Sequence, residues 1–450
     1  MRKRVVGTSI LVVVGALVVW CANRWKAWFH NPDEAPYEAA ATPSRVLLTF
    51  GDENGLNRNV SWTCGDEVCD AFVELLDETD SLFRKVKAEG EVFVSRGGSS
   101  CYYVARLRGL DAGHSYRYRV WTGKDCSPWY VFRLPEADDH ETSFLYMGDV
   151  QDSIGGIANQ LLKRAFGQHP DAEFLVCGGD LTERPTDAFW NEVFEGLDSV
   201  GQAVPVLTVT GNHDYLKAPI CVLERRFSLI HSYFLDSMVG ENQVFTVRYK
   251  DVQLFCLDSN REFFYLWTQR QWLNKQLAAS MAKWKVVVLH HPLYSTHGSA
   301  NNLIQRWMFD DLIQAHGVDL VLQGHEHAYA RMTQHDEEGN ATTPIYTVSH
   351  CSPKNYRIHF DERFDKFGSG SRYYQRIHTH ADTLFMVAYD AVEGTRYDSL
   401  YVVKTAAGTT LTDAGQEIQE CITFMPASGS VKDAAFAERI NNYKKRKNLR

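Results

Sequence analysis

Between residues 45 and 135, apolar side chains recur at every second position in short runs. Val46–Phe50, Tyr116–Val120 and Trp129–Arg133 show this alternation, and Gly, Pro, Asn and Asp residues separate the runs. Alternation places successive side chains on opposite faces of a strand, so that one face is apolar. Many short strands with turns between them predict an all-β sandwich over residues 45–135.

From residue 140 onward, apolar strands are followed by segments of helical periodicity. Apolar runs predict strands at Phe144–Met147, Phe174–Cys177, Val206–Val209, Lys285–Leu289 and Leu320–Leu322. Apolar residues at helical spacing predict helices over Ile157–Phe166 and Phe189–Leu197. Strands that alternate with helices predict a layered α/β domain, which we place at residues 140–404.

Polar side chains directly follow these five predicted strands. They are Asp149, Asp180, Asn212, His290 and the pair His325 and His327. The C-terminal ends of strands are where open α/β sheets bind ligands. A Gly-Asp pair alone is usually a turn, and a lone His-x-His is usually a surface feature. Their coincidence at successive strand ends predicts a single functional site.

The chemistry of this set favours metal ions. Carboxylate, amide and imidazole groups are ligands for divalent iron, manganese or zinc. His325 and His327 are two residues apart, so on an extended segment both imidazoles point to one side and each can reach a different metal. Two metal ions can hold the oxygens of a phosphoryl group and a bridging hydroxide. The sequence therefore predicts a two-metal site that acts on phosphate esters.

The strand-end motifs resemble those of the calcineurin-like metallophosphoesterase superfamily. The motifs are Gly148-Asp149, Gly179-Asp180, Gly211-Asn212-His213-Asp214, Val287-Val288-Leu289-His290 and Gly324-His325-Glu326-His327. The preceding sandwich, Pro292–Ser295 and Tyr329–Arg331 are most similar to the purple acid phosphatase branch, and Leu107–Tyr116 resembles a fibronectin type III pattern. The resemblance implies a four-layer αββα metallophosphoesterase domain of the α/β class, preceded by an all-β fibronectin type III-like sandwich.

The resemblance also implies a role for each residue. It places the first metal on Asp149 and His327, the bridge on Asp180, and the second metal on Asn212, His290 and His325. His213 would contact the phosphate and either stabilise the transition state or protonate the leaving alkoxide. His297, in the loop after Pro292, is a candidate second contact to the phosphate.

Two residues depart from the family pattern. The purple enzymes have Tyr where this chain has Glu183, so the resemblance implies a colourless enzyme with divalent metals. Many relatives have His where this chain has Gln151, which could coordinate the first metal or hydrogen-bond a bound water. The Glu183 carboxylate could pair with His213 and raise its pKa, or face solvent, and Asp214 is the alternative partner of His213.

The N-terminus predicts export. Arg2–Arg4 precede the apolar run Val5–Trp20, a pattern typical of a secretory signal or an N-terminal membrane anchor over residues 1–24. The run has no obvious cleavage site, which favours an anchor, followed by a linker over residues 25–44. The body should then be extracytoplasmic, whether periplasmic, cell-surface or secreted. We assign residues 405–450 to a C-terminal tail that ends in the basic run Lys444–Lys447.

The net charge limits the classes of partner that we expect this protein to bind. The formal net charge of −9 disfavours nucleic acid, so we expect a small phosphorylated substrate, with the membrane contacted through the N-terminal segment. Ten cysteines in 450 residues do not define a disulfide framework, and their pairing stays open, as does the oligomeric state.

The leading function is phosphomonoesterase. A phosphodiesterase with the same metals and an inactive binding or adhesion protein are the alternatives.

Overall fold

The computed structural model describes residues 15, 19–25, 29–233, 235, 239–240, 243–298, 300–426 and 429–449. The predicted anchor at Val5–Trp20 lies largely outside these residues. Across the described ranges, no helix is both long and apolar enough to cross a membrane.

The N-terminal domain is the predicted β-sandwich. It contains β1 (Ser44–Phe50), β2 (Arg58–Thr63), β3 (Ala71–Asp77), β4 (Leu82–Val94), β5 (Ser99–Leu107), β6 (Ser115–Thr122), β7 (Asp125–Cys126) and β8 (Tyr130–Arg133). The first half of β4 pairs with β3 and its second half with β5, so the sheet folds over a shared core that includes Trp62 and Tyr118. In β8 the inward residue is Phe132, whereas Val131 is 45% exposed, so the apolar alternation expected at Trp129–Arg133 is out of register by one residue.

Two seven-stranded sheets form the second domain. The first sheet has the order β11-β10-β9-β21-β22-β23-β24 and the second β14-β15-β16-β17-β19-β18-β20. The first contains β9 (Ser143–Met147), β10 (Phe174–Cys177), β11 (Val206–Thr208), β21 (Tyr373–His380), β22 (Thr383–Asp390), β23 (Arg396–Thr405) and β24 (Gly408–Asp413). The second contains β14 (Phe245–Tyr249), β15 (Val252–Cys256), β16 (Trp284–Leu289), β17 (Leu320–Gln323), β18 (Tyr329–His335), β19 (Ala341–Val348) and β20 (Lys366–Gly368).

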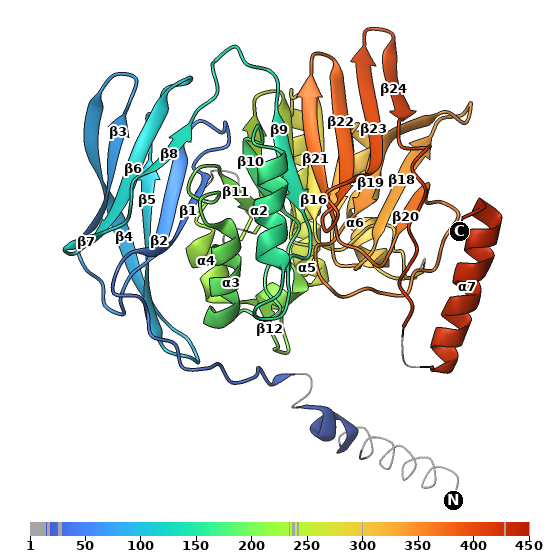
Figure 1. Ribbon diagram of the computed structural model, residues 1–450, viewed down its shortest axis with the longest axis horizontal. Helices are drawn as coiled ribbons and strands as arrows, with labels where there is room; N and C mark the ends of the chain where they lie inside the picture. Colours follow the sequence, from blue (N-terminus) through green and yellow to red (C-terminus); the bar gives the residue numbers. More distant parts are fainter. Residues whose placement is uncertain are drawn as a thin grey trace, which may run out of the picture.

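The sheets face each other and carry helices on their outer sides (Figure 1). Their inner faces share a core that includes Phe144, Val176, Val286 and Leu320, because both sheets are apolar on that side. The helices α2 (Ala158–Gln168) and α3 (Asp187–Leu197) cover the first sheet, and α5 (Phe263–Ala279) and α6 (Leu303–Ala315) cover the second. The four-layer αββα architecture is confirmed. The loops also contain a short helix, α4 (Arg225–Ile230), and a hairpin formed by β12 (Tyr215–Leu216) and β13 (Val222–Leu223).

The described part of the predicted tail, residues 405–426 and 429–449, packs on the second domain rather than standing apart from it. Strand β24 extends the first sheet beside β23, and α7 (Val431–Lys447) packs on the second domain. The buried residues Phe436, Ile440 and Tyr443 recur on one face of α7 and join the core over α5 and α6. The basic run lies in the last turn of α7, where cations complement the helix dipole.

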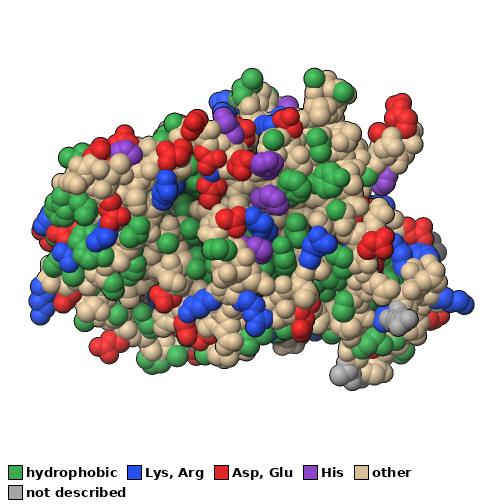
Figure 2. Space-filling view, turned by 45° about the horizontal axis from the view of Figure 1, so that its top comes forward, with side chains coloured by type: hydrophobic (Ala, Val, Ile, Leu, Met, Phe, Trp, Pro, Cys, Tyr) green, Lys and Arg blue, Asp and Glu red, His purple; other side chains and the backbone are tan. Residues whose placement is uncertain are grey.

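Positive and negative side chains are mixed on the surface, and the cysteines are unpaired. On the face seen in Figure 2, Lys and Arg side chains are interspersed with Asp and Glu rather than gathered. All ten cysteines fall within the described residues, and each carries a free thiol.

Candidate metal centre

The loops after β9, β10, β11, β16 and β17 meet at one end of the two sheets. Strand β10 runs parallel to β9 and β11, and β16 runs parallel to β17, so their C-terminal ends lie at the same edge. Each loop contributes predicted ligands: Asp149, Asp180, Asn212, His290, and His325 with His327. The structure brings all six together.

One half of the site gathers around His290. The Nε2 atom of His290 lies 3.4 Å from Oδ2 of Asp180 and 3.1 Å from Oδ1 of Asn212. The Nδ1 atom of His325 lies 2.8 Å from the same Asn212 oxygen and 3.2 Å from His290 Nε2. These four side chains therefore direct ligand atoms at one point, as the second-metal set requires.

The other half gathers around His327. Its Nε2 atom lies 3.4 Å from Oδ1 of Asp149 and 3.2 Å from Nε2 of Gln151. Oδ1 of Asp149 and Oε1 of Gln151 are buried and, among the described residues, have no hydrogen-bond partner. Buried polar atoms are nearly always bonded, so two orphaned oxygens beside one imidazole fit a metal ion. The amide assignment of Gln151 can be exchanged, which would turn its oxygen toward His327.

Asp180 connects the two halves. Ligand atoms of Asp149, Asp180 and His290 lie within 4.8 Å of one another, and all three residues are buried. Burial opposes a charge on His290, but Asp180, Asp149 and the Gly178 carbonyl together outweigh it and raise the pKa of His290 to about 10. A pocket that stabilises a proton on His290 also stabilises a cation there. The donor set and its charge fit the two-metal centre.

The main chain is strained at three of the ligands. Asp149, Asp180 and His325 have φ values of 47°, 51° and 69°, a region that L-residues rarely occupy. The glycines beside them provide clearance, because a Cβ atom on Gly211 would lie 2.1 Å from Asp180 Oδ1. A Cβ on Gly324 would lie 2.4 Å from Asp149 Oδ2. Backbone held in this region sets the direction of each ligand side chain.

Hydrogen bonds to the far side of the ligands fix their orientation. Nδ1 of His290 donates to the Gly178 carbonyl oxygen at 2.9 Å, which leaves Nε2 toward the site. The main-chain N–H of His325 donates to Asp149 Oδ2 at 2.6 Å. The ring of His327 lies between those of His350 and Tyr356, at centroid distances of 5.4 Å and 4.3 Å.

The hydrogen-bond partner of His213 differs from the carboxylate that the sequence suggests. Its Nδ1 atom lies 2.7 Å from the main-chain carbonyl oxygen of Glu183, and Nε2 lies 4.0 Å from Asp180 Oδ2. The Glu183 carboxylate instead binds Lys354, at 2.6 Å and 2.7 Å. The predicted carboxylate–imidazole pair is therefore replaced by a main-chain contact, and the Glu183 carboxylate pairs with Lys354.

Asp214 supports the loop and does not orient His213. Its buried Oδ2 accepts hydrogen bonds from the N–H groups of Gly211 at 2.7 Å and Asp180 at 3.3 Å. Burial and the neighbouring charge of Asp180 raise the pKa of Asp214 to about 8. This carboxyl group ties the loops after β10 and β11 to each other.

The loop after β19 contributes residues that the sequence did not reveal. Tyr356 stacks on His327 and lies 5.3 Å, ring to ring, from His297, while Lys354 binds Glu183. His297 is thus at the edge of the site, next to Tyr356. No motif marks this loop, and only the folded chain brings it over the metal ligands.

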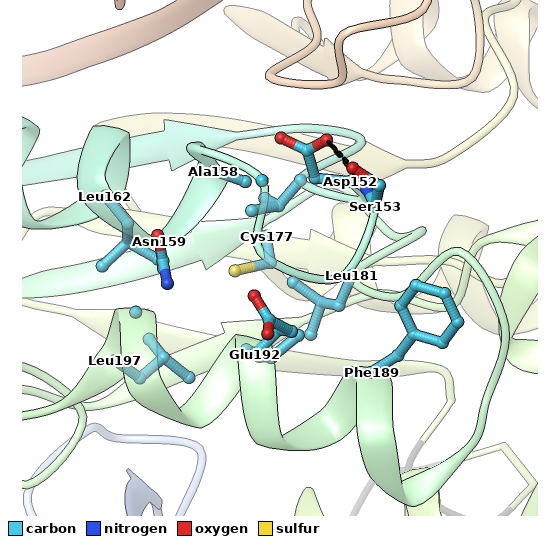
Figure 3. Close-up of a pocket in the computed structure, with 14 residues that line it drawn as sticks. Asp152, Ser153, Ala158, Asn159, Leu162, Cys177, Leu181, Phe189, Glu192 and Leu197 are labelled. Carbon is cyan, nitrogen blue, oxygen red and sulfur yellow. Dashed lines mark hydrogen bonds between the residues drawn. The ribbon is translucent and has the colours of Figure 1, made fainter. Parts of the chain in front are cut away.

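The pocket shown in Figure 3 is separate from the ligand atoms. It lies between α2 and α3, with a cavity volume of about 30 Å³, and Leu162, Cys177, Leu181 and Leu197 line it. Its walls include neighbours of Asp149 and Asp180, so it packs behind the metal-binding loops. At this size it admits little more than a water molecule.

Comparisons with known families agree with this geometry. Residues 142–329 match the calcineurin-like phosphoesterase family, and residues 43–134 match the purple acid phosphatase N-terminal domain. The fold and site thus define a metallophosphoesterase, a hydrolase of phosphoric ester bonds. Within that class, residues 142–329 form a calcineurin-like phosphoesterase domain, and residues 43–134 form a purple acid phosphatase N-terminal domain.

Individual relatives are distant. The chain is 23% identical to purple acid phosphatase 3 of Arabidopsis thaliana over 289 residues, which cover 57% of this chain and 76% of that protein. It is 21% identical to the Fe(3+)-Zn(2+) purple acid phosphatase 12 of Arabidopsis thaliana over 359 residues, which cover 73% of this chain and 75% of that protein. A solved structure of PhoD superposes with a TM-score of 0.61 and 13% identity, covering 92% of this chain and 99% of that one. At that identity the likeness supports the fold alone.

Proposed function

We propose that this protein is a phosphomonoesterase that uses two divalent metal ions. The proposal rests on Asp180, whose carboxylate has ligand atoms within 4.8 Å of those of both Asp149 and His290 and so is within reach of both metals. The metal pair would supply positive charge for the phosphoryl oxygens and an activated water. Small phosphorylated molecules are the substrates that this centre suits.

His213 is the proposed acid. Because Nδ1 donates to the Glu183 carbonyl, Nε2 is the atom that faces the substrate. The imidazole must carry a proton on both nitrogens to donate from Nε2 to the leaving oxygen. His297 and Tyr356 stand at the edge of the same space and are proposed to contact the phosphate or the leaving group.

A substrate comparison tests the ester class. The metal-reconstituted protein should hydrolyse an aryl phosphomonoester with a kcat/KM well above that for the matching diester. A preference for the diester would make the protein a phosphodiesterase. Absence of turnover on both esters in protein that retains its metals would favour a binding protein instead.

We also propose that the body is extracytoplasmic and tethered by Val5–Trp20. The support is the basic Arg2–Arg4 cluster that precedes this apolar run, since positive charge remains on the cytoplasmic side. Protease added to intact cells, with any outer envelope permeabilised, should digest the body. Protection until the inner membrane is lysed would reverse the topology.

A further inference from the structure

Six large apolar side chains stand exposed on the loops and helix ends near the metal centre. We call them the apolar rim: Ile220, Phe263, Phe264, Trp267, Ile304 and Trp307. Phe264 is 82% exposed and Ile220 is 67% exposed. Single exposed apolar residues are ordinary, but a group of them marks an interaction surface.

Ring contacts and a hydrogen bond join these side chains into one surface. The ring of Phe263 stacks on Trp307 at a centroid distance of 5.8 Å and meets Phe264 at 5.7 Å. The N–H of Cys221, next to Ile220, donates to Oε1 of Glu262 at 2.7 Å. The loop between β12 and β13 is therefore held against the start of α5, and α5 against α6.

The apolar rim shares a face with the metal centre. Helices α5 and α6 begin where the chain leaves the C-terminal ends of β15 and β16. Gln305 donates to the Ser259 carbonyl oxygen at 3.1 Å, and the Ser259 hydroxyl contacts Nδ1 of His291 at 3.0 Å. The His291 ring in turn lies 4.2 Å from the ring of His325, a proposed metal ligand.

The linker is fixed to this same face. The side chain of Asn31 donates to the Lys217 carbonyl oxygen at 3.0 Å and accepts from the Lys217 N–H at 2.8 Å. Glu34 binds the buried Arg226 at 2.6 Å. In Figure 1 the N-terminal segment leaves the body along the lower edge, beneath the hairpin that contains β12. The loop that holds the linker is also the loop that carries Ile220.

The fixed linker limits how far this face can be from a membrane. Trp20, at the end of the apolar run, precedes Asn31 by eleven positions. A chain of that length spans at most about 40 Å even when fully extended. A bilayer that holds Val5–Trp20 must therefore lie near the face with the apolar rim.

We propose that the apolar rim rests in the interface of that lipid bilayer, with the metal centre open toward the membrane surface. The inference rests on the proposed anchor at Val5–Trp20. Trp and Phe are the side chains that prefer the interfacial region, and one short apolar anchor holds a protein more firmly when a second contact assists it. Phosphate esters on lipid headgroups would then reach the metal centre without leaving the membrane.

Photolabelling of the full chain in vesicles tests the contact. The protein is reconstituted in phosphatidylcholine and phosphatidylglycerol vesicles that contain a photoreactive phospholipid, and labelled peptides are identified by mass spectrometry. Peptides with Phe264 and Trp307 should carry label. Leu82 and Phe83 are the matched control, because they are 64% and 54% exposed at the opposite end of β4 from the linker contact at Gly97.

A double variant, Phe264→Ser with Trp307→Ser, should lower the labelling of this face by about tenfold, since it removes two exposed aromatic side chains that the bilayer interface would bury. Its turnover of a soluble aryl phosphate should equal that of the unmodified chain, because neither residue touches the metal centre. Phe83→Ser should change neither quantity.

Three results would overturn the docking proposal: label confined to the N-terminal segment, equal label on Leu82 and Phe83, or lipid-independent cross-links between two copies through the apolar rim. Failure of the proposed enzyme function is distinguishable, because it would abolish aryl phosphate turnover while the lipid labelling persisted.

Discussion

The main-chain carbonyl oxygen of Glu183 lies 2.7 Å from Nδ1 of His213. A main-chain acceptor fixes the ring whatever side chain stands at position 183, and it leaves the Glu183 carboxylate to bind Lys354. The orientation of the proposed acid is thus a property of the loop after β10 rather than of a carboxylate–imidazole pair.

Replacing the carboxylate should therefore have little effect on catalysis. We expect Glu183→Gln to keep kcat within about fivefold, the range of a partly exposed ion pair, and to leave its pH profile in place. His213→Asn should lower kcat by about a hundredfold or more, the usual contribution of a general acid. Steady-state kinetics across pH distinguish the two. If Glu183→Gln were as impaired as His213→Asn, the Glu183 carboxylate rather than the main-chain carbonyl would orient His213.

The orphaned Gln151 oxygen predicts a role in metal binding. Gln151→Ala should weaken one of the two metals by about tenfold to a hundredfold, as the loss of a supporting group in a metal site does. The second metal, on His290 and Asn212, should bind as before. Competition with a chelator, followed by metal analysis, measures both. Equal loss of the two metals would assign Gln151 to the fold instead.

The absence of Tyr at position 183 predicts an enzyme without a phenolate-to-iron band. Tyr356 is the aromatic residue on the first-metal side, but its ring lies flat on His327, with 12° between their planes. We expect no intense visible absorption, rapid loss of activity on chelation, and recovery with added manganese, zinc or iron(II). A visible spectrum beside metal analysis checks this. An intense band that Tyr356→Phe abolishes would make Tyr356 a ligand and contradict the expectation.

A buried ion cluster fixes the linker to the catalytic domain. Arg226 is fully buried and binds Glu34 of the linker, Asp187 of α3 and Glu224. Arg226→Met would leave three carboxylates without their shared cation, and we expect a loss of about 3–5 kcal/mol in the free energy of unfolding. Arg225→Met is the control, because its pair with Glu91 is exposed and should contribute at most about 1 kcal/mol. Urea unfolding of both variants measures the difference, and equal losses would show that the cluster is not structural.

The strands of the catalytic domain were predictable because they are buried on both faces. Such strands appear in the sequence as continuous apolar runs, and the polar residue after each run marks the edge of the sheet where ligands gather. The sequence therefore located Asp149, Asp180 and His290 without knowledge of the sheet order. It also indicated the sandwich, although the alternation at β8 was displaced by one residue because Val131 is apolar yet exposed.

Features set by tertiary contact could not be predicted. The partner of Nδ1 on His213 is a carbonyl group, which every residue possesses, so no residue type signals it. Tyr356 reaches His327 through a loop without a motif. Helix α7 lies where the sequence predicts a tail, because the basic end dominates its composition, although Phe436, Ile440 and Tyr443 follow helical spacing.

Asp180→Asn is the decisive test of the shared carboxylate in the two-metal centre. Asparagine keeps the shape of the side chain and can still accept the 2.7 Å hydrogen bond from the His213 N–H, but it lacks the charge that both metals share. Turnover of an aryl phosphomonoester and metal content should be measured on the same folded preparation, with Glu183→Gln as control. We expect turnover to fall by about a hundredfold or more and the occupancy of both metals to decrease. Turnover close to that of the unmodified chain, with both metals retained, would contradict this expectation.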